Sequence, residues 1–324
     1  MHIARTDAGT KLIKDLTEYV QKVVLDKRLK RLALNEVDDS FSNEKDVIWV
    51  SQDIAEFLEL TSIDSTPHIE LAQTGSEKKN IARILVLIPG ASANGRLWHP
   101  AMCGLWCHDL CLDPKYGFEH ATMEKTIDFA EAQGCNLVLM NPNVREDESM
   151  TEMHENATKH VHGVWKNVVR ALLSSGVGGS TTSGRSGEAP VVDILAHSRG
   201  GYNAMQLLLD VVKDSEAEWH SLGKVALTDA VDFQGMHAAQ NDCDVERVEK
   251  LLRQDRLRNY VPLQHGVGQP EAIVFQRITD AGGNEKNRVA QEADTHPSTH
   301  CHAQEEIFKW FAGHGAMEAS TGTS

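Results

Sequence analysis

The sequence has 324 residues, 41% of them hydrophobic, and its 47 acidic residues against 32 Lys and Arg give a formal net charge of −15. This hydrophobic content suffices for the core of one large α/β domain, whereas the acidic balance disfavours non-specific binding to nucleic acid. The chain shows no signal peptide and no run of about 18 apolar residues that could cross a membrane, and it has six cysteines, so we expect reduced thiols and an intracellular protein.

The first 79 residues are expected to lead into the main domain. Apolar residues at helical spacing predict an amphipathic helix over residues 9–32. Two short apolar segments, 47–51 and 68–72, are candidate strands, with a small helix over 54–60 between them. We expect this lead-in to pair at the edge of a sheet.

The next segment predicts a buried strand at Ile84–Ile88, which ends at Pro89-Gly90. Small residues follow, and they allow a backbone to approach a substrate closely. In hydrolases whose nucleophile sits on a sharp strand-to-helix turn, the loop after this strand supplies one N–H group to the oxyanion. We place that donor at Ala91 or Ser92, and the alternative is a plain Pro-Gly turn.

Three cysteines recur every four residues at Cys103, Cys107 and Cys111. On a helix they would share one face. Tight metal-ligand spacing such as C-x₂-C is absent, and free cysteine packs as a small apolar side chain. The pattern therefore favours a helix packed in the core, with no metal site.

A further buried strand is predicted at 136–140, and it leads directly into Asn141-Pro142-Asn143. The polar residues 144–154 then indicate a surface loop or lid, followed by a helix over 156–173 that carries His160. Asn141, Asn143 and His160 are therefore candidates for the substrate side, although a histidine in this position is also compatible with packing or with the surface.

The most specific motif is Val191–Tyr202, in which an apolar strand stops at His197-Ser198-Arg199-Gly200-Gly201 and a helix follows from Tyr202 to Val212. A strand, a sharp turn with Ser198 at its tip and a helix form the nucleophile-elbow pattern G-x-S-x-G, here with Ala196 in place of the first glycine. In this geometry the N–H group of Arg199 points into the oxyanion site. The alternative is an ordinary turn whose serine caps the helix.

The acid and the base of a catalytic triad are sought downstream of Ser198. A strand at 224–227 ends before Asp229, where a triad acid is needed; Asp232 is the reserve, and Asp280, after a possible late strand at 272–278, is the other acid position. Capping of a helix by Asp229 is the alternative. A histidine-rich loop precedes a final helix that opens at Ile307, and it contains His296, the leading base, together with His300 and His302.

The order Ser…Asp…His is that of the α/β-hydrolase class. We therefore expect an α/β fold with an α/β-hydrolase-type, mostly parallel sheet and helices on both faces. The main domain would span residues 80–312, with a flexible Gly/Ser-rich insertion at 174–190 and a disordered tail at 313–324.

Several segments resemble one known family, the Argonaute-binding-protein (Arb-type) domain, which also occurs in animal cotranscriptional regulators. They are VLIPGASANGRLW, LVLMNPN, HVHGVW, AHSRGGYNAM, VALTDAVD and ADTHPSTHCHAQEEIFKWF. The resemblance runs from about residue 80 to 312, and the family's positions fall on Ser198, Asp229, His296 and His160. It implies a cytoplasmic or nuclear protein, and some members act through protein partners in small-RNA silencing, heterochromatin or splicing.

Two functions follow as expectations. In the first, the protein hydrolyses an ester, thioester or amide of a small acyl substrate, with Ser198 as nucleophile, His296 as base and Asp229 as the acid that orients it. This chemistry needs no cofactor and no metal. In the second, the same fold is a non-catalytic scaffold for a protein partner in RNA regulation, without direct contact to nucleic acid or membrane, because a fold does not determine a function.

Overall fold

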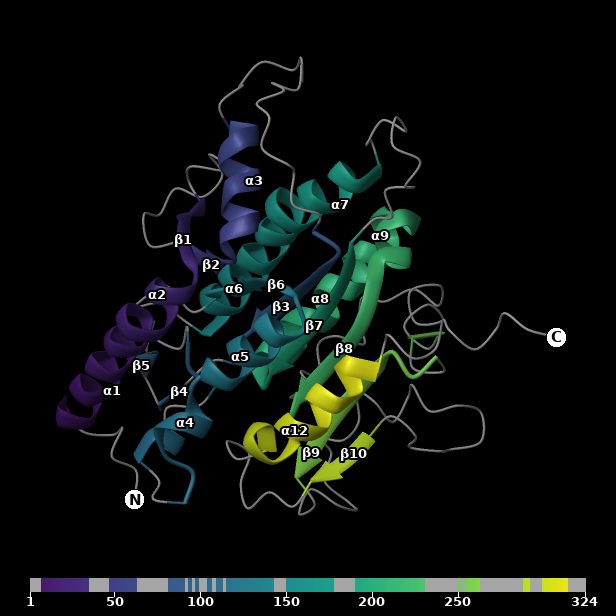
Figure 1. Ribbon diagram of the computed structural model, residues 1–324. Helices are drawn as coiled ribbons and strands as arrows, with labels where there is room; N and C mark the ends of the chain where they lie inside the picture. The colour runs from purple at the N-terminus through teal and green to yellow at the C-terminus, as the bar shows by residue number, and fades with distance from the viewer. Residues whose placement is uncertain are drawn as a thin grey trace.

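Within the described part of the chain, eight strands form one sheet in the order β1-β2-β6-β3-β7-β8-β9-β10, with helices on both faces (Figure 1). The structure is a computed structural model, and it describes residues 7–34, 47–62, 81–90, 93–94, 97–98, 104–106, 109–112, 115–142, 150–177, 190–230, 250–251, 254–262, 288–291 and 299–313. The strands of the sheet are β1 (Lys30–Ala33), β2 (Val47–Val50), β3 (Arg83–Ile88), β6 (Asn136–Leu139), β7 (Val191–His197), β8 (Leu222–Thr228), β9 (Leu257–Pro262) and β10 (Arg288–Gln291). Two short strands, β4 (Ala93–Asn94) and β5 (Leu97–Trp98), pair separately.

The described helices lie before, between and after these strands along the chain. They are α1 (Asp7–Val20), α2 (Asp26–Arg28), α3 (Gln52–Ser62), α4 (Gly117–Ala121), α5 (Glu124–Ala132), α6 (Met150–Val164), α7 (Arg170–Val177), α8 (Arg199–Asp214), α9 (Glu216–Ser221) and α12 (Thr299–Ala312). A π-helical turn, Gln21–Leu25, joins α1 to α2, and another, Trp165–Val169, joins α6 to α7.

The pairing of the strands confirms the expected fold class. Among the described strands, β2 runs antiparallel to both of its neighbours, and every other neighbouring pair of the large sheet is parallel. Counted in chain order, its strands lie in the spatial order first, second, fourth, third, fifth to eighth. The protein therefore has an α/β fold, with a mostly parallel sheet and helices on both of its faces.

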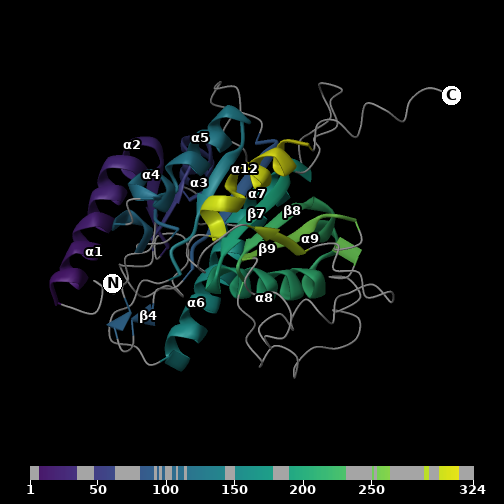
Figure 2. The same cartoon turned by 90° about the horizontal axis from the view of Figure 1, so that it is seen from below.

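Apolar residues at every position of a central strand explain why helices cover both faces of the sheet. In β3, Ile84, Val86 and Ile88 join the core beneath α3, α6 and α8, whereas Leu85 and Leu87 join the core beneath α1, α5 and α12. Side chains of successive strand residues point to opposite faces, so an all-apolar strand must be covered twice. Figure 2 shows α12 and α8 on opposite sides of the sheet.

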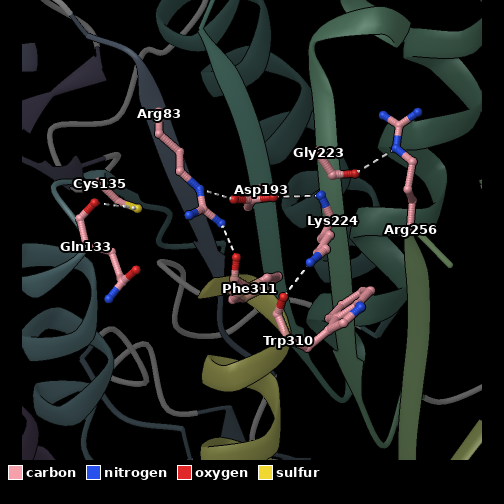
Figure 3. Close-up of polar contacts among 9 residues, drawn as sticks. All are labelled: Arg83, Gln133, Cys135, Asp193, Gly223, Lys224, Arg256, Trp310 and Phe311. Carbon is pink, nitrogen blue, oxygen red and sulfur yellow. Dashed lines mark hydrogen bonds and ion pairs between the residues drawn. The ribbon is translucent and has the colours of Figure 1, made fainter. Parts of the chain in front are cut away.

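The end of the last helix is held by a buried charge network at the amino ends of β3 and β7 (Figure 3). Asp193 forms an ion pair with Arg83 at 2.6 Å and accepts the N–H of Lys224 at 2.6 Å. The Arg83 guanidinium donates to the carbonyl of Phe311 at 2.8 Å, and the Lys224 ammonium donates to the carbonyl of Trp310. Two cations thus bind carbonyls that have no partner within the helix.

The N-terminal helix ends earlier than the sequence predicts. Helical structure stops at Arg28, and Leu29 adopts an extended conformation that starts the edge strand β1. Lys30 to Ala33 carry no period-two apolar pattern, so the register of β1 against β2 decides their conformation. The predicted strand at 47–51 and helix at 54–60 are present as β2 and α3, while the candidate strand at 68–72 lies outside the described residues.

The predicted helix that would align the three cysteines is wrong where the structure describes it. Gly104 has a φ of +93°, and Leu105 forms an antiparallel bridge with Thr122, so the chain is not helical at these positions. Cys111 lies in a short 3₁₀ helix, Asp109–Leu112. Cys103 and Cys107 lie outside the described residues.

Two later helices begin earlier than predicted. Helix α6 starts at Met150, within the segment predicted as a loop or lid, and α12 starts at Thr299 and not at Ile307, which moves His300 and His302 from a loop into a helix. Strands β9 and β10 have no counterpart in the sequence predictions, and the candidate strand 272–278 lies outside the described residues. So do residues 178–189 of the Gly/Ser-rich insertion and residues 314–324 of the tail.

Candidate active site

Ser198 lies in a strained turn between β7 and α8. Its φ of +52° is left-handed, a conformation that costs a non-glycine residue about 1–3 kcal/mol and is concentrated at functional sites. The turn is held by two main-chain hydrogen bonds, from the Ser198 N–H to the Thr228 carbonyl at 2.8 Å and from the Gly201 N–H to the Ser198 carbonyl at 2.9 Å. These are the strand, sharp turn and helix that the elbow pattern predicts.

The small residues around Ser198 allow the elements to approach each other. A Cβ atom on Gly200 would lie 2.6 Å from the main-chain oxygen of Pro89 and closer still to that of Ile88. A Cβ atom on Gly90 would lie 3.0 Å from Ser198 Cβ. The end of β3 therefore packs directly against the elbow, as the sequence predicts for the loop that would carry the second oxyanion donor.

The candidate acid stands beside the candidate nucleophile. The last residues paired between β7 and β8 are His197 and Thr228, so Ser198 and Asp229 are the next residues on two neighbouring parallel strands, whose backbones lie about 4.8 Å apart. Asp229 also has a left-handed φ, +47°, and its N–H donates to the Tyr260 carbonyl at 2.6 Å. Only three described residues other than glycine have a positive φ, and Ser198 and Asp229 are two of them.

The strand order creates a topological switch point at this edge of the sheet. The chain crosses from β3 to β6 on one side and returns to β7 on the other side of β3. Ligands of open α/β sheets bind at such a switch point, outside the carboxyl ends of the strands. Ser198 follows the carboxyl end of β7, next to the end of β3.

Arg199 is the first residue of the 16-residue helix α8, and it is buried. The first N–H groups of a helix have no partner within the helix and lie at the positive end of its dipole. The Arg199 N–H thus has the character that an oxyanion donor needs. The other expected site residues, Ala91, Ser92, Asn143, Asp232, Asp280 and His296, lie outside the described residues.

His160 and Asn141 are in contact at the carboxyl end of β6. The Asn141 main-chain N–H donates to His160 Nε2 at 3.0 Å, and both residues are buried. Because Nε2 accepts this hydrogen bond, its lone pair is not available to take a proton from a substrate. His160 therefore holds the end of β6, whereas the Asn141 side-chain oxygen, buried and without a hydrogen bond from the described residues, can accept one from a ligand.

Beneath the elbow lies a buried polar cluster of His197, Thr228 and His300, whose roles the sequence did not reveal. His197 Nδ1 lies 3.0 Å from both the carbonyl and the hydroxyl oxygen of Thr228. His300 Nδ1 lies 3.2 Å from the same hydroxyl, and its ring stacks on Trp106 with 4.1 Å between centroids. The signal in the sequence was Thr228, a polar residue at the end of an otherwise apolar strand, next to Asp229.

The buried His300 makes the stability of the fold depend on pH. Burial lowers its pKa to about 3 from an ordinary value of 6.5, so between these pH values the unfolded chain binds a proton that the folded chain does not, and stability falls as the pH falls. We expect this group to remove about 2 kcal/mol from the free energy of unfolding between pH 7 and pH 5. Urea denaturation of the wild type and His300→Phe at both pH values measures this, and equal pH dependence of the two proteins would contradict it.

Two kinds of site are not seen in the described part of the chain. Those residues contain no group of three or more His, Cys, Asp or Glu side chains arranged to hold a metal ion. In the same ranges, no helix combines the length and the apolar character that a bilayer crossing requires.

Comparison with known proteins adds little about activity. No protein-family model matches the sequence, and no curated protein does. Among solved structures, the chain is similar to one described as "Structure of the histone deacetylase Clr3", with a TM-score of 0.48 and 8% sequence identity, over 94% of this chain and 38% of that chain. The chain thus spans well under half of that protein, and so distant a likeness says nothing about its reaction.

Proposed function

We propose that the protein is a serine hydrolase that cleaves an ester, thioester or amide bond of a small acyl substrate. The observation that carries this proposal is the left-handed Ser198 in a strand–turn–helix elbow at the switch point of the sheet. Strain at this position is expected where the hydroxyl must stand exposed to a substrate above the sheet. Asp229, at the end of the next strand, supports the same assignment.

In this mechanism, Ser198 Oγ attacks the substrate carbonyl carbon while His296 accepts the hydroxyl proton. The N–H groups of Arg199 and of Ala91 or Ser92 donate to the oxyanion of the tetrahedral intermediate. His296 then returns the proton to the leaving group, and the acyl-enzyme forms. A water molecule then attacks the acyl carbon while His296 takes its proton, and His296 returns that proton to Ser198 Oγ as the acyl–oxygen bond breaks and the acid leaves. Asp229 accepts a hydrogen bond from His296 and stabilises its imidazolium form.

The covalent chain supports His296 as the base. His296 precedes Thr299, the first residue of α12, by three residues, which span about 11 Å when fully extended. In the first turn of α12, His300 contacts Thr228, the neighbour of Asp229. The length of chain between His296 and α12 is therefore compatible with a base that acts near the end of β8.

Membership of the Arb-type domain family, with a cytoplasmic or nuclear location, is the second part of the proposal. It is supported by the family-like motifs that surround the described site, AHSRGGYNAM at the elbow and VALTDAVD at the acid. The scaffold role of some members makes binding of a protein partner the alternative that the following experiment decides.

The experiment is labelling with a fluorophosphonate probe, which reacts with an activated serine. We expect the folded wild type to be labelled at Ser198, as located by peptide mapping, and Ser198→Ala to show no labelling. Loss of a triad serine lowers kcat about 10⁶-fold in enzymes of this kind. Ser221 provides the control. Its hydroxyl donates to the Ala217 carbonyl, away from the elbow, and Ser221→Ala should label like the wild type. A folded wild type without label would exclude the hydrolase and favour the scaffold.

A further inference from the structure

The His197–Thr228–His300 cluster joins three elements around the proposed nucleophile. His197 ends β7, Thr228 ends β8 and His300 lies in the first turn of α12. All three side chains are buried, and His300 and Thr228 are fully buried. The Thr228 carbonyl also accepts the N–H of Ser198 at 2.8 Å, so one residue contacts both His197 and the elbow.

The hydrogen bonds of the cluster define the protonation of its rings. A carbonyl oxygen only accepts, so the contact of His197 Nδ1 with the Thr228 carbonyl requires a proton on Nδ1. The Thr228 hydroxyl has one proton, and it lies 3.2 Å from His300 Nδ1 and 3.5 Å from the Ala196 carbonyl. Either His300 Nδ1 accepts that proton, or it donates its own while the hydroxyl donates to Ala196. In both arrangements His300 Nδ1 holds the hydroxyl of Thr228, and burial keeps the ring neutral by lowering its pKa to about 3.

We propose that His300 is a positioning residue for the Ser198 elbow and acts through Thr228. This inference rests on the proposed hydrolase function. His300 is held from behind by its stack on Trp106, and it fixes the Thr228 side chain, whose main chain fixes Ser198 and continues into Asp229. The nucleophile and the acid therefore share one support.

The cluster also lies against the turn after β3, on the proposed oxyanion side of Ser198. A Cβ atom on Gly90 would lie 3.3 Å from Cδ2 of His197 and 3.0 Å from its main-chain oxygen. The His197 ring thus lies between Thr228 and the turn after β3, from which the second oxyanion donor is proposed to come. A shift of Thr228 would be transmitted to both sides of Ser198. Displacement of reacting groups by about 1 Å can cost a factor of about 10² in rate.

The test compares variants that separate the hydrogen bond from the ring stack. His300→Phe keeps an aromatic ring on Trp106 but removes the bond, whereas His300→Asn keeps a polar atom near the position of Nδ1 and loses the stack. Thr228→Val removes the hydroxyl with little change of shape, and Thr228→Ser restores it. The readout is the fluorophosphonate reaction, resolved into its saturation constant and its maximal rate constant, on protein shown by circular dichroism to be folded.

We expect His300→Phe and Thr228→Val to lower the maximal rate constant about 10- to 100-fold, with the saturation constant changed less than about twofold. His300→Asn and Thr228→Ser should recover most of the rate. Thr126→Val is the matched control, because the buried Thr126 hydroxyl bonds Trp106 and Gln304 and not Thr228. It should lower the melting temperature without slowing the reaction.

Two results would overturn the inference alone: a labelled wild type with His300→Phe and Thr228→Val reacting at the wild-type rate, or a control variant slowed as much as these two. An unlabelled, folded wild type would instead remove the hydrolase proposal and this inference with it.

Discussion

Replacing Asp193 with alanine is expected to lower the free energy of unfolding by about 3–5 kcal/mol, the cost of removing one partner of a buried ion pair. The side chain of Asp193 is 1% exposed, and the side chain of Arg83, whose guanidinium it binds, is 18% exposed. Without the carboxylate, Arg83 keeps its charge in a largely buried place, and the Lys224 N–H loses its acceptor. Urea denaturation followed by circular dichroism measures the change.

The loss should also loosen the end of α12. Arg83 and Lys224 donate to the carbonyls of Phe311 and Trp310, and Asp193 holds both cationic residues in place. We therefore expect hydrogen exchange in Asp193→Ala to rise first in the last turn of α12.

Two variants serve as controls for Asp193. Asp193→Asn keeps one acceptor oxygen for Lys224 and should lose less stability than the alanine variant. Asp15→Ala breaks the pair with Lys11, which is 2.6 Å long with both side chains more than half exposed, and it should leave the free energy of unfolding almost unchanged, because solvent screens exposed ion pairs. If the free energy of unfolding of Asp193→Ala lay within about 1 kcal/mol of the wild-type value, the network would not be a stabilising element.

Adding one methyl group at Gly200 is expected to damage both the fold and the site. The new Cβ atom would overlap the main-chain oxygens of Ile88 and Pro89, which belong to the end of a strand and cannot rotate away as a side chain can. Overpacking of this kind costs about 3 kcal/mol, more than the roughly 1 kcal/mol that alanine contributes over glycine inside a helix. To relieve it, α8 and β3 must separate.

That separation should abolish the proposed chemistry as well. It moves Ser198 and Arg199 away from the turn after β3, so we expect Gly200→Ala to react with a fluorophosphonate at least about 10²-fold more slowly than the wild type. Gly117→Ala is the control, since its Cβ atom would meet nothing within 4 Å although its φ is +65°. It should cost about 1 kcal/mol for the left-handed backbone and leave the reaction rate unchanged. A stable Gly200→Ala that reacts normally would contradict the close packing of the elbow.

Local patterns in the sequence were sufficient to predict the strands that are apolar on both faces. The runs at 84–88, 136–140 and 191–196 indicated buried parallel strands, because a strand covered by helices on both faces needs no polar alternation. The elbow was equally predictable, since Ser198 between small residues at a strand-to-helix junction reflects a local steric demand. Local sequence alone is therefore enough to place Ser198, Arg199 and Asp229 at one edge of an α/β sheet.

Other features depended on partners distant in the sequence, and only the tertiary structure decided them. Lys30–Ala33 became a strand because β2 offers it a hydrogen-bonded edge, although the residues continue a helical pattern. His300 became a buried helical residue because Trp106 and Thr228 receive it, whereas its sequence neighbours suggested a loop. Asp193 and Thr228 were visible as polar residues in apolar strands, but their partners come from β3, β7, β8 and α12. The fold class and the elbow at Ser198 follow from local sterics and hydrophobic periodicity, while the support beneath the elbow follows from long-range packing.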